Sequence, residues 1–259
     1  MPIVFYSIVI NNKVWYNYIE IMENIFSIKI ADLVFKIKSK FDYVKEFCKE
    51  FLTDEPSDFF IETTLEELEQ EQGLYSVKYP LKYLETTCVY RHIAQLLPLK
   101  NRVVMHGVAL KYLDSGFLFI APSGVGKTTH AKLWQEYLGE KVEIINGDKP
   151  ILEFSDNGII LHSNPWCGKE GIYKKTTAKL KGVCIVSRGK NSICQVDLSD
   201  SLNSILVQIF MPTKEEFADK TLLLLEKLYS VKIYKLKCDI SKNAFLTSYN
   251  ALTGDKYEN

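Results

Sequence analysis

Residues 121–128 read A-P-S-G-V-G-K-T, so a lysine and a threonine follow two closely spaced glycines. Apart from Ala121 at its first position, the stretch matches the phosphate-binding pattern G-x-x-x-x-G-K-[ST]. Glycine reaches backbone angles that are closed to other residues, so Gly124 and Gly126 allow successive N–H groups to point toward one anion. We expect Lys127 to reach the β- and γ-phosphates of ATP, and the Thr128 hydroxyl to bind Mg²⁺. The residues predicted to hold the nucleotide are Ser123, Gly124, Val125, Gly126, Lys127, Thr128, Thr129 and, from a later strand, Arg188.

A magnesium site needs a second anchor, which is usually an acidic residue at the end of a neighbouring strand. Asp148 in "KVEIINGDKP" directly follows an apolar run that is typical of a strand. The tripeptide "NGD" is also typical of a tight turn, so a plain turn residue is the alternative. We predict that Asp148 binds the metal or activates the phosphoryl acceptor.

Further polar residues lie near the loop in sequence and are candidates for catalysis. His106, in "VMHGVAL", precedes the loop by one predicted hairpin, although a lone histidine between strands often has a purely structural role. Lys169 and Glu170 lie in the polar, glycine-bearing loop "NPWCGKEGIY" and could face the phosphates. Arg188 ends the predicted strand "CIVSR", where it could clamp a phosphate group.

The elements that position these residues indicate an α/β domain over residues 101–259, with hairpins mixed into its sheet. The loop is expected between a strand and a helix, and the strand is reached through a turn at "LDSG". His130 and Trp134 are four residues apart on that helix, and we expect them to pack together rather than line a substrate cleft. Further strands are predicted over residues 141–146, 180–188 and 232–237, a hairpin over 149–163 through Asp156-Asn157-Gly158, and helices over 198–210, capped by Ser199 or Asp200, and 213–230.

Residues 1–100 are predicted to form a smaller α+β region, which could recognise the substrate. Strands are expected over residues 3–10 and 27–38, where β-branched and aromatic residues dominate. Helices are expected over residues 41–52, 64–73 and 81–97. The second helix has a capping box of Thr64 and Glu67 at its start and Gly73 as its expected C-cap.

The composition limits the classes of partner. The 32 basic and 32 acidic side chains give a net charge of +0, which argues against a nucleic-acid or anionic membrane surface as partner. No apolar run reaches the length of a membrane span, and the N-terminal stretch does not resemble a signal peptide. Six scattered cysteines without a C-x-x-C pair indicate reduced thiols. We therefore expect a cytoplasmic protein.

The motifs "MHGVAL", "GFLFIAPSGVGKTT" and "EIINGDKP", in this order and spacing, resemble the catalytic core of HPr kinase/phosphorylase. This family shares its nucleotide-binding fold with ATP-dependent phosphoenolpyruvate carboxykinase. The resemblance covers roughly residues 102–210, and with "PWCGKEG" it extends to uncharacterised HPr-kinase-like proteins of Firmicutes. It implies a P-loop kinase fold, ATP and Mg²⁺ as cofactors, and His106, Lys127, Thr128 and Asp148 as site residues.

The chain departs from the family at one position that matters for catalysis. Where the family has two consecutive aspartates, this chain has Gly147-Asp148. One acid must then serve both metal and acceptor, or the base comes from Glu170, Glu153 or His162. The family's arginine-glycine segment also has no counterpart, and Lys169 is a possible replacement. These departures argue against the reverse phosphorylase reaction.

Together these observations predict an Mg-ATP-dependent kinase that transfers the γ-phosphoryl group to a hydroxyl acceptor. The expected acceptor is a Ser or Thr of a peptide or small protein, or a small metabolite. The chain could also assemble as a homo-oligomer. The alternative is a non-catalytic ATP-binding regulatory protein. A phosphoenolpyruvate carboxykinase is less favoured, because the chain is short for that family and the lysine and histidine of its second metal site cannot be placed. The guanine-reading sequence N-K-x-D does not occur, which argues against a GTPase.

Overall fold

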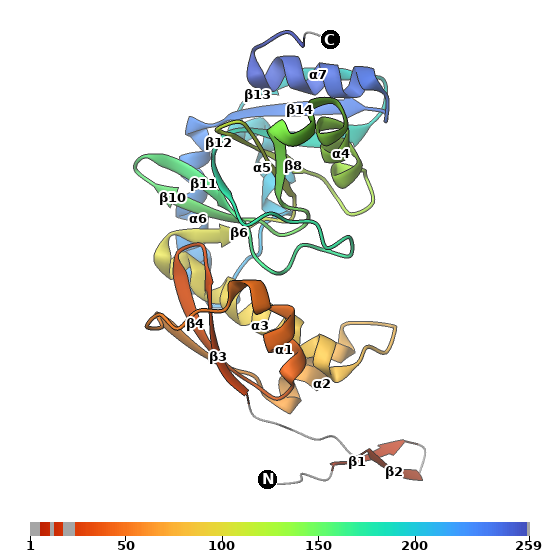
Figure 1. Ribbon diagram of the computed structural model, residues 1–259, viewed down its shortest axis with the longest axis vertical. Coiled ribbons are helices and arrows are strands. Elements are labelled where there is room, and N and C mark those ends of the chain that lie inside the picture. Colours follow the sequence, from red (N-terminus) through yellow and green to blue (C-terminus); the bar gives the residue numbers. More distant parts are fainter. Residues whose placement is uncertain (1–5, 11–12, 18–23, 258–259) are drawn as a thin grey trace. The chain divides into compact units, whose positions relative to one another are not determined.

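The computed structural model describes residues 6–10, 13–17 and 24–257 (Figure 1). The chain divides into two compact units, Met1–His92 and Ile93–Asn259, and the division falls inside helix α3 (Leu81–Leu96). Of the residues that the structure describes, no helix combines the length and hydrophobicity that a membrane span requires.

The first unit contains two separate small sheets. Strands β1 (Tyr6–Ile10) and β2 (Lys13–Asn17) form an antiparallel hairpin, and residues 3–5 of the strand predicted over 3–10 lie outside the described residues. The second sheet has the order β3-β4-β5, with β3 antiparallel and β5 parallel to β4. The bounds are β3 (Asn24–Ile30), β4 (Leu33–Ser39) and β5 (Phe59–Glu62).

The single strand predicted over residues 27–38 is wrong, because the chain reverses within it. Ala31 and Asp32 have φ angles of 48° and 59°, and they connect β3 to β4 as a two-residue turn. Two left-handed residues match the twist of the flanking strands, which favours this turn in hairpins. Alanine is unusual at such a position and the turn contains no glycine, so the sequence pattern did not indicate it.

The helices of the first unit follow the predicted order with different ends. The predicted helix over residues 41–52 is divided into α1 and a short 3-10 turn, and the capping box of Thr64 and Glu67 is confirmed. Gly73 is the last residue of α2, and Leu74 is the C-cap in place of the predicted glycine. The bounds are α1 (Asp42–Phe47), η1 (Lys49–Phe51) and α2 (Leu65–Gly73).

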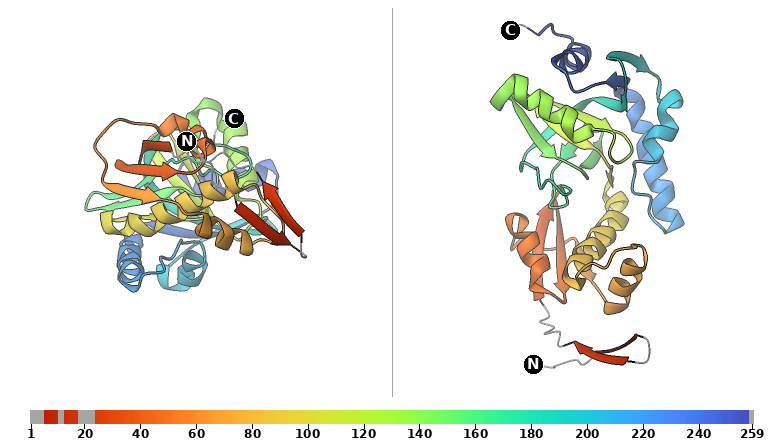
Figure 2. Two further views of the ribbon diagram at one scale, coloured as in Figure 1. Left: turned by 90° about the horizontal axis from the view of Figure 1, so that it is seen from below. Right: turned by 90° about the vertical axis from the view of Figure 1, so that its right-hand side faces the viewer.

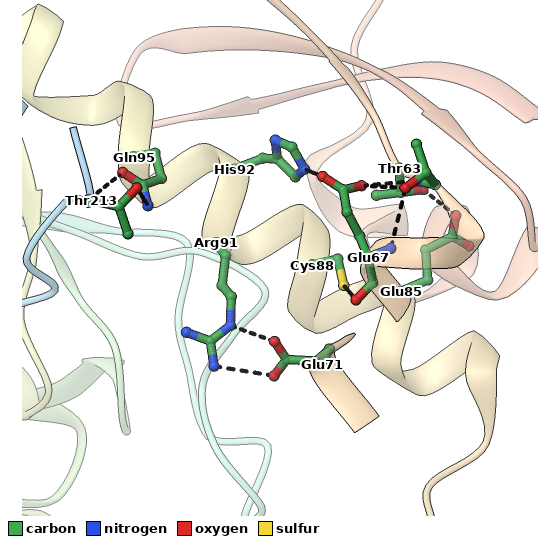
Figure 3. A network of polar contacts seen from close by, with 10 residues as sticks. Thr63, Glu67, Glu71, Glu85, Cys88, Arg91, His92, Gln95 and Thr213 are labelled. Atoms are coloured by element: carbon green, nitrogen blue, oxygen red, sulfur yellow. Dashed lines mark hydrogen bonds and ion pairs between the residues drawn. The ribbon is translucent and has the colours of Figure 1, made fainter. Parts of the chain in front are cut away.

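Two buried carboxylates tie α3 to the rest of the first unit (Figure 3). The Glu71 carboxylate on α2 accepts hydrogen bonds from Arg91 Nε at 2.7 Å and Nη2 at 3.1 Å. Glu85 on α3 accepts from two backbone N–H groups after β4 at 2.6 and 2.9 Å, and from the Thr63 hydroxyl. Since buried carboxylates need such partners, these contacts hold both helices and the sheet edge together.

The second unit is built on a mixed sheet with the order β6-β10-β11-β12-β8-β7-β9, to which β14 adds against β12 and β13 against β14. The mixed α/β architecture predicted from the sequence is therefore confirmed. The strands are β6 (Arg102–Val104), β7 (Val108–Tyr112), β8 (Ser115–Ile120), β9 (Val142–Asn146), β10 (Ile151–Ser155), β11 (Gly158–His162), β12 (Thr177–Arg188), β13 (Ser192–Val196) and β14 (Lys232–Cys238).

Helices cover both faces of this sheet (Figure 2). Successive side chains of a strand point to opposite faces, and β8 shows the consequence. Leu118 and Ile120 lie in a core with α5 and α6, whereas Phe117 and Phe119 lie in a second core with α4 and α7. The helical segments are η2 (Leu97–Lys100), α4 (Lys127–Leu138), η3 (Gly139–Lys141), α5 (Leu198–Leu206), α6 (Glu215–Glu226), η4 (Lys227–Ser230) and α7 (Lys242–Thr253).

Strand direction decides which residues meet at one edge of the sheet. Strands β8, β12 and β14 are parallel, and β7 is antiparallel to both β8 and β9. Strands β8, β9 and β12 therefore all end at the same edge. The residues after Ile120 and Asn146, together with Arg188, are brought to that edge, which is the usual location of ligand sites in α/β sheets.

Several predicted elements of this unit are confirmed, and others were missed or misplaced. The β10–β11 hairpin turns at Gly158, whose φ is +116°, and β7–β8 turns at Leu113 with a φ of 53°. Strand β13 and helix α7 were not predicted. Helix α5 begins after Asp197, so the predicted cap at Ser199 or Asp200 is wrong.

Candidate nucleotide site

The loop between β8 and α4 owes its shape to two glycines. Gly124 and Gly126 have φ angles of +78° and +121°, in the region that strongly favours glycine. An added Cβ would meet nothing within 4 Å at either position, so glycine is required by the backbone angle and not by space. Ala121 is buried and has no positive φ, as its compatibility with the loop requires. The residue before α4 provides no side-chain cap, so N–H groups of the first turn remain for an anion.

Lys127 begins α4 with its ammonium group turned back under the loop. Its Nζ donates to the Ala121 carbonyl at 2.8 Å and to the Pro122 carbonyl at 3.4 Å, and lies 3.3 Å from His106 Nε2. Burial lowers the pKa of Lys127, and the nearby Asp148 charge opposes this. The lysine is thus a buried cation beneath the loop.

His106 and Asp148 are adjacent because their backbones pair. The N–H groups of Met105 and Gly107 donate to the carbonyls of Pro150 and Asp148 at 3.2 and 2.9 Å. This pairing places His106 Nε2 3.4 Å from Asp148 Oδ1. His106, Lys127 and Asp148, which come from three separate segments, therefore form one cluster.

Asp148 is held in its ionised form. Burial raises the pKa of its carboxyl group, but the His106 hydrogen bond and the charge and hydrogen bond of Lys149 outweigh burial and keep the pKa at about 2. The side chain of Asn146 accepts the N–H groups of Asp148 and Lys149 at 2.9 and 2.7 Å, which fixes the turn after β9. The turn interpretation of "NGD" is therefore confirmed, and the role of Asp148 as metal ligand or acceptor activator stays a prediction. Lys149, which forms an ion pair with Asp148, was missed in the sequence analysis.

The loop over residues 163–176 covers the position before Asp148. The Gly147 N–H donates to the Ile172 carbonyl at 3.0 Å, and a Cβ at Gly147 would lie 3.1 and 3.2 Å from the carbonyl oxygens of Ile172 and Cys167. Gly168, with a φ of +82°, is so close to Asp148 that an added Cβ would lie 2.8 Å from its Cβ. The space that a side chain at position 147 would need is thus occupied by loop backbone, which explains the glycine.

The predicted residues Lys169 and Glu170 lie on the exposed part of this loop. Glu170 forms an ion pair with Lys132 on the exposed side of α4. Within the part of the chain that the structure describes, neither of them forms a hydrogen bond or an ion pair with Lys127 or Asp148. The structure therefore does not bring them into the cluster, and their catalytic role stays a prediction.

Arg188 contacts the loop through its guanidinium group. Its Nε and Nη2 donate to the carbonyls of Val125 and Gly124 at 3.2 and 2.6 Å. Carbonyl groups held outward in this way leave the opposite N–H sides of the loop free to face an anion. Ser123 and Thr129 are exposed and Thr128 is half-buried on the first turn of α4.

The remaining candidates belong to other contacts. His130 and Trp134 both hydrogen-bond the Ser248 hydroxyl, at 2.8 and 3.0 Å, and are buried, so the packing interpretation is confirmed. His162 Nε2 lies 2.8 Å from Glu153 on the β10–β11 hairpin, and that carboxylate also accepts from an arginine of β6. As possible bases, Glu153 and His162 thus pair with each other in the described structure.

A cavity of about 660 Å³ lies at the opposite end of β8 from the loop. Its lining includes Ser115, Phe117, Lys179, Lys181 and Lys232. It contains none of the predicted site residues. Because the ionised and hydrogen-bonded groups converge at the other edge of the sheet, we place the candidate site there.

No protein-family model matches the chain, and no curated protein matches it either. Among solved structures, the chain is similar to the HPr(Ser) kinase/phosphatase from Coxiella burnetii. The two share 8% sequence identity with a TM-score of 0.35, over 59% of this chain and 99% of that one. A likeness of this degree carries no argument about function, which rests on the geometry described above.

Proposed function

We propose that the protein is an Mg-ATP-dependent phosphotransferase that moves the γ-phosphoryl group to a hydroxyl acceptor. The observation that carries this proposal is that His106 Nε2 lies 3.3 Å from Lys127 Nζ and 3.4 Å from Asp148 Oδ1, beside a loop with two left-handed glycines. A loop of this shape before a helix supports binding of a phosphate chain, and the cluster supports chemistry at its end.

The residues present fit a magnesium ion. Asp148 has a pKa of about 2, so at neutral pH it offers the hard anionic oxygen that Mg²⁺ prefers. Thr128 offers a hydroxyl on the first turn of α4, after the loop lysine. When bound, Mg²⁺ supplies neutralisation of charge on the phosphate oxygens. The loop N–H groups and Lys127 bind and orient the same phosphates.

The acceptor hydroxyl must approach in line with the γ-phosphoryl group. Asp148 and His106 lie together where they can orient that hydroxyl, and burial of Lys127 strengthens its interaction with transferred charge. Catalysis in this proposal is mainly positioning and charge neutralisation. The acceptor is a Ser or Thr of a peptide or small protein, or a small metabolite.

One observation favours a second candidate, a non-catalytic ATP-binding regulatory protein. Loop carbonyls close the space beside Gly147, so Asp148 is the acid that must serve both the metal and the acceptor. Asp148→Asn and Lys127→Ala discriminate the two candidates. A kinase loses its cellular role with either substitution, whereas a regulator loses it with Lys127→Ala alone.

The test is incubation with γ-labelled ATP, Mg²⁺ and candidate peptides, alongside direct measurement of ATP binding. We expect Lys127→Ala to abolish tight binding, and Asp148→Asn to keep binding while transfer falls about 100- to 1000-fold. Glu136→Ala, at an exposed position of the same helix, is the matched control and should leave both unchanged. Intact ATP binding with no transfer would refute the kinase, and oxaloacetate-dependent decarboxylation would identify a carboxykinase instead.

A further inference from the structure

Gln208 is a buried residue that contacts His106 through both its backbone and its side chain. Its carbonyl oxygen accepts the His106 N–H at 2.6 Å, and its Oε1 lies 2.8 Å from His106 Nδ1. The Phe210 N–H donates to the Val104 carbonyl at 3.0 Å, so residues 208–210 run beside residues 104–106. The Gln208 side chain is therefore held by main-chain pairing and by burial.

This contact has a chemical consequence for the imidazole ring. An amide oxygen only accepts hydrogen bonds, so the ring nitrogen that faces it must carry the hydrogen. The neutral ring then has its lone pair on Nε2, which is the nitrogen 3.3 Å from Lys127 Nζ and 3.4 Å from Asp148 Oδ1. With hydrogen fixed on Nδ1, Nε2 accepts a hydrogen bond from the Lys127 ammonium group when the ring is neutral, and donates one to the Asp148 carboxylate when the ring is protonated.

We propose that Gln208 is a positioning residue, which holds His106 in the Nδ1–H tautomer so that Nε2 faces the reacting groups. The role in transfer rests on the proposed phosphotransferase function, whereas the effect on the tautomer does not. In the opposite tautomer, Nδ1 would carry a lone pair toward the Gln208 oxygen, and two acceptors would oppose each other 2.8 Å apart. The ring would then move from its position beside Lys127 and Asp148.

The test uses NMR of the full chain labelled with ¹⁵N at its histidines. The chain has four histidines, so their resonances can be assigned. Long-range ¹H–¹⁵N spectra distinguish the two tautomers directly. We expect Nδ1–H at His106 in the wild type and in Gln208→Glu, which keeps an acceptor oxygen. Gln208→Met has a similar length without an acceptor, and we expect it to lose this signature.

The activity arm compares the same variants. We expect Gln208→Met to lower kcat about 10- to 100-fold with little change in the KM for ATP, and Gln208→Glu to restore most of it. Unchanged resonances of His130 and His162 show that the fold is kept, and Gln208→Asn repeats the test if the methionine variant unfolds. An unchanged tautomer in Gln208→Met, or its loss in Gln208→Glu as well, would overturn the inference. A wild type with the Nδ1–H signature but no transfer would overturn the proposed function alone.

Discussion

Protonation of His130 should destabilise the second unit between pH 6.5 and 4. His130 is buried on α4 against Phe119, with ring centroids 5.1 Å apart, and its Nε2 hydrogen-bonds Ser248. Within the described residues, its Nδ1 is the buried side-chain atom without a partner. Burial lowers the pKa of His130 from 6.5 to about 4, because a charged ring there would lack solvent and a counterion.

The sign and the size of the effect follow from this pKa. Since the unfolded chain binds the proton more tightly than the folded one, stability is fully present above pH 6.5 and is lost as the pH falls toward 4. Each pKa unit corresponds to about 1.4 kcal/mol, so the loss reaches about 3 kcal/mol near pH 4. For a domain with about 5 to 15 kcal/mol of stability, this is a large fraction.

The assay is urea denaturation at several pH values between 7.5 and 4, followed by tryptophan fluorescence, to which the buried Trp134 contributes. The matched variant is His130→Leu, which has no titrating group and leaves Ser248 its hydrogen bonds with Trp134 and the Phe245 carbonyl. The difference in unfolding free energy between wild type and variant isolates His130 from other groups. As the pH falls from 7.5 to 4, we expect the wild type to lose about 3 kcal/mol more unfolding free energy than His130→Leu does. Parallel curves for the two proteins would refute the reasoning.

Three further predictions test the contacts around the loop and in the first unit. Gly147→Ala should lower the unfolding free energy by about 1 to 3 kcal/mol, because two carbonyl oxygens lie within 3.2 Å of the added Cβ. Gly147→Asp should lower it by at least as much, and it should not raise the rate of phosphoryl transfer. Urea denaturation measures this, with Gly73→Ala as a control that meets no atom within 4 Å. Arg188→Met should weaken ATP affinity about 10-fold, because two loop carbonyls lose their hydrogen bonds. Arg188→Lys should recover part of this affinity, and titration calorimetry measures both variants. Equal affinities of Arg188→Met and the wild type would show that the loop keeps its shape without the arginine. Arg91→Met should destabilise the first unit by about 2 kcal/mol, since the Glu71 carboxylate stays buried without its cation. Adding Glu71→Gln should reverse part of the loss, as measured by thermal melts. A double variant less stable than Arg91→Met would contradict this.

The features that the sequence predicted well are those encoded over a few neighbouring residues. The glycines of the loop, the capping box of Thr64 and the turn before Gly158 each depend on local backbone angles or on groups three residues apart. The contacts that complete the site join distant segments instead. Gln208 and His106 are 102 positions apart and meet because separate segments pair beside β6, which no local pattern records.

The glycine before Asp148 shows how such distant contacts change the meaning of a motif. The resemblance drawn from the sequence motifs marks Gly147 as a position where an acidic residue is missing. In the structure it is the position at which the loop over residues 163–176 packs against the end of β9.

The balance of charge in the cluster follows from that packing. With one carboxylate, the two ammonium groups of Lys127 and Lys149 outnumber the acid they surround. In the proposed kinase, this excess of positive charge would favour binding of a polyphosphate, and Asp148 would have to release Lys149 in order to hold Mg²⁺. Nucleotide binding would then depend mainly on the loop and the lysines, whereas transfer would depend on Asp148 and on the histidine beside it. This separation is why substitutions at Lys127 and at Asp148 can distinguish an enzyme from a regulator.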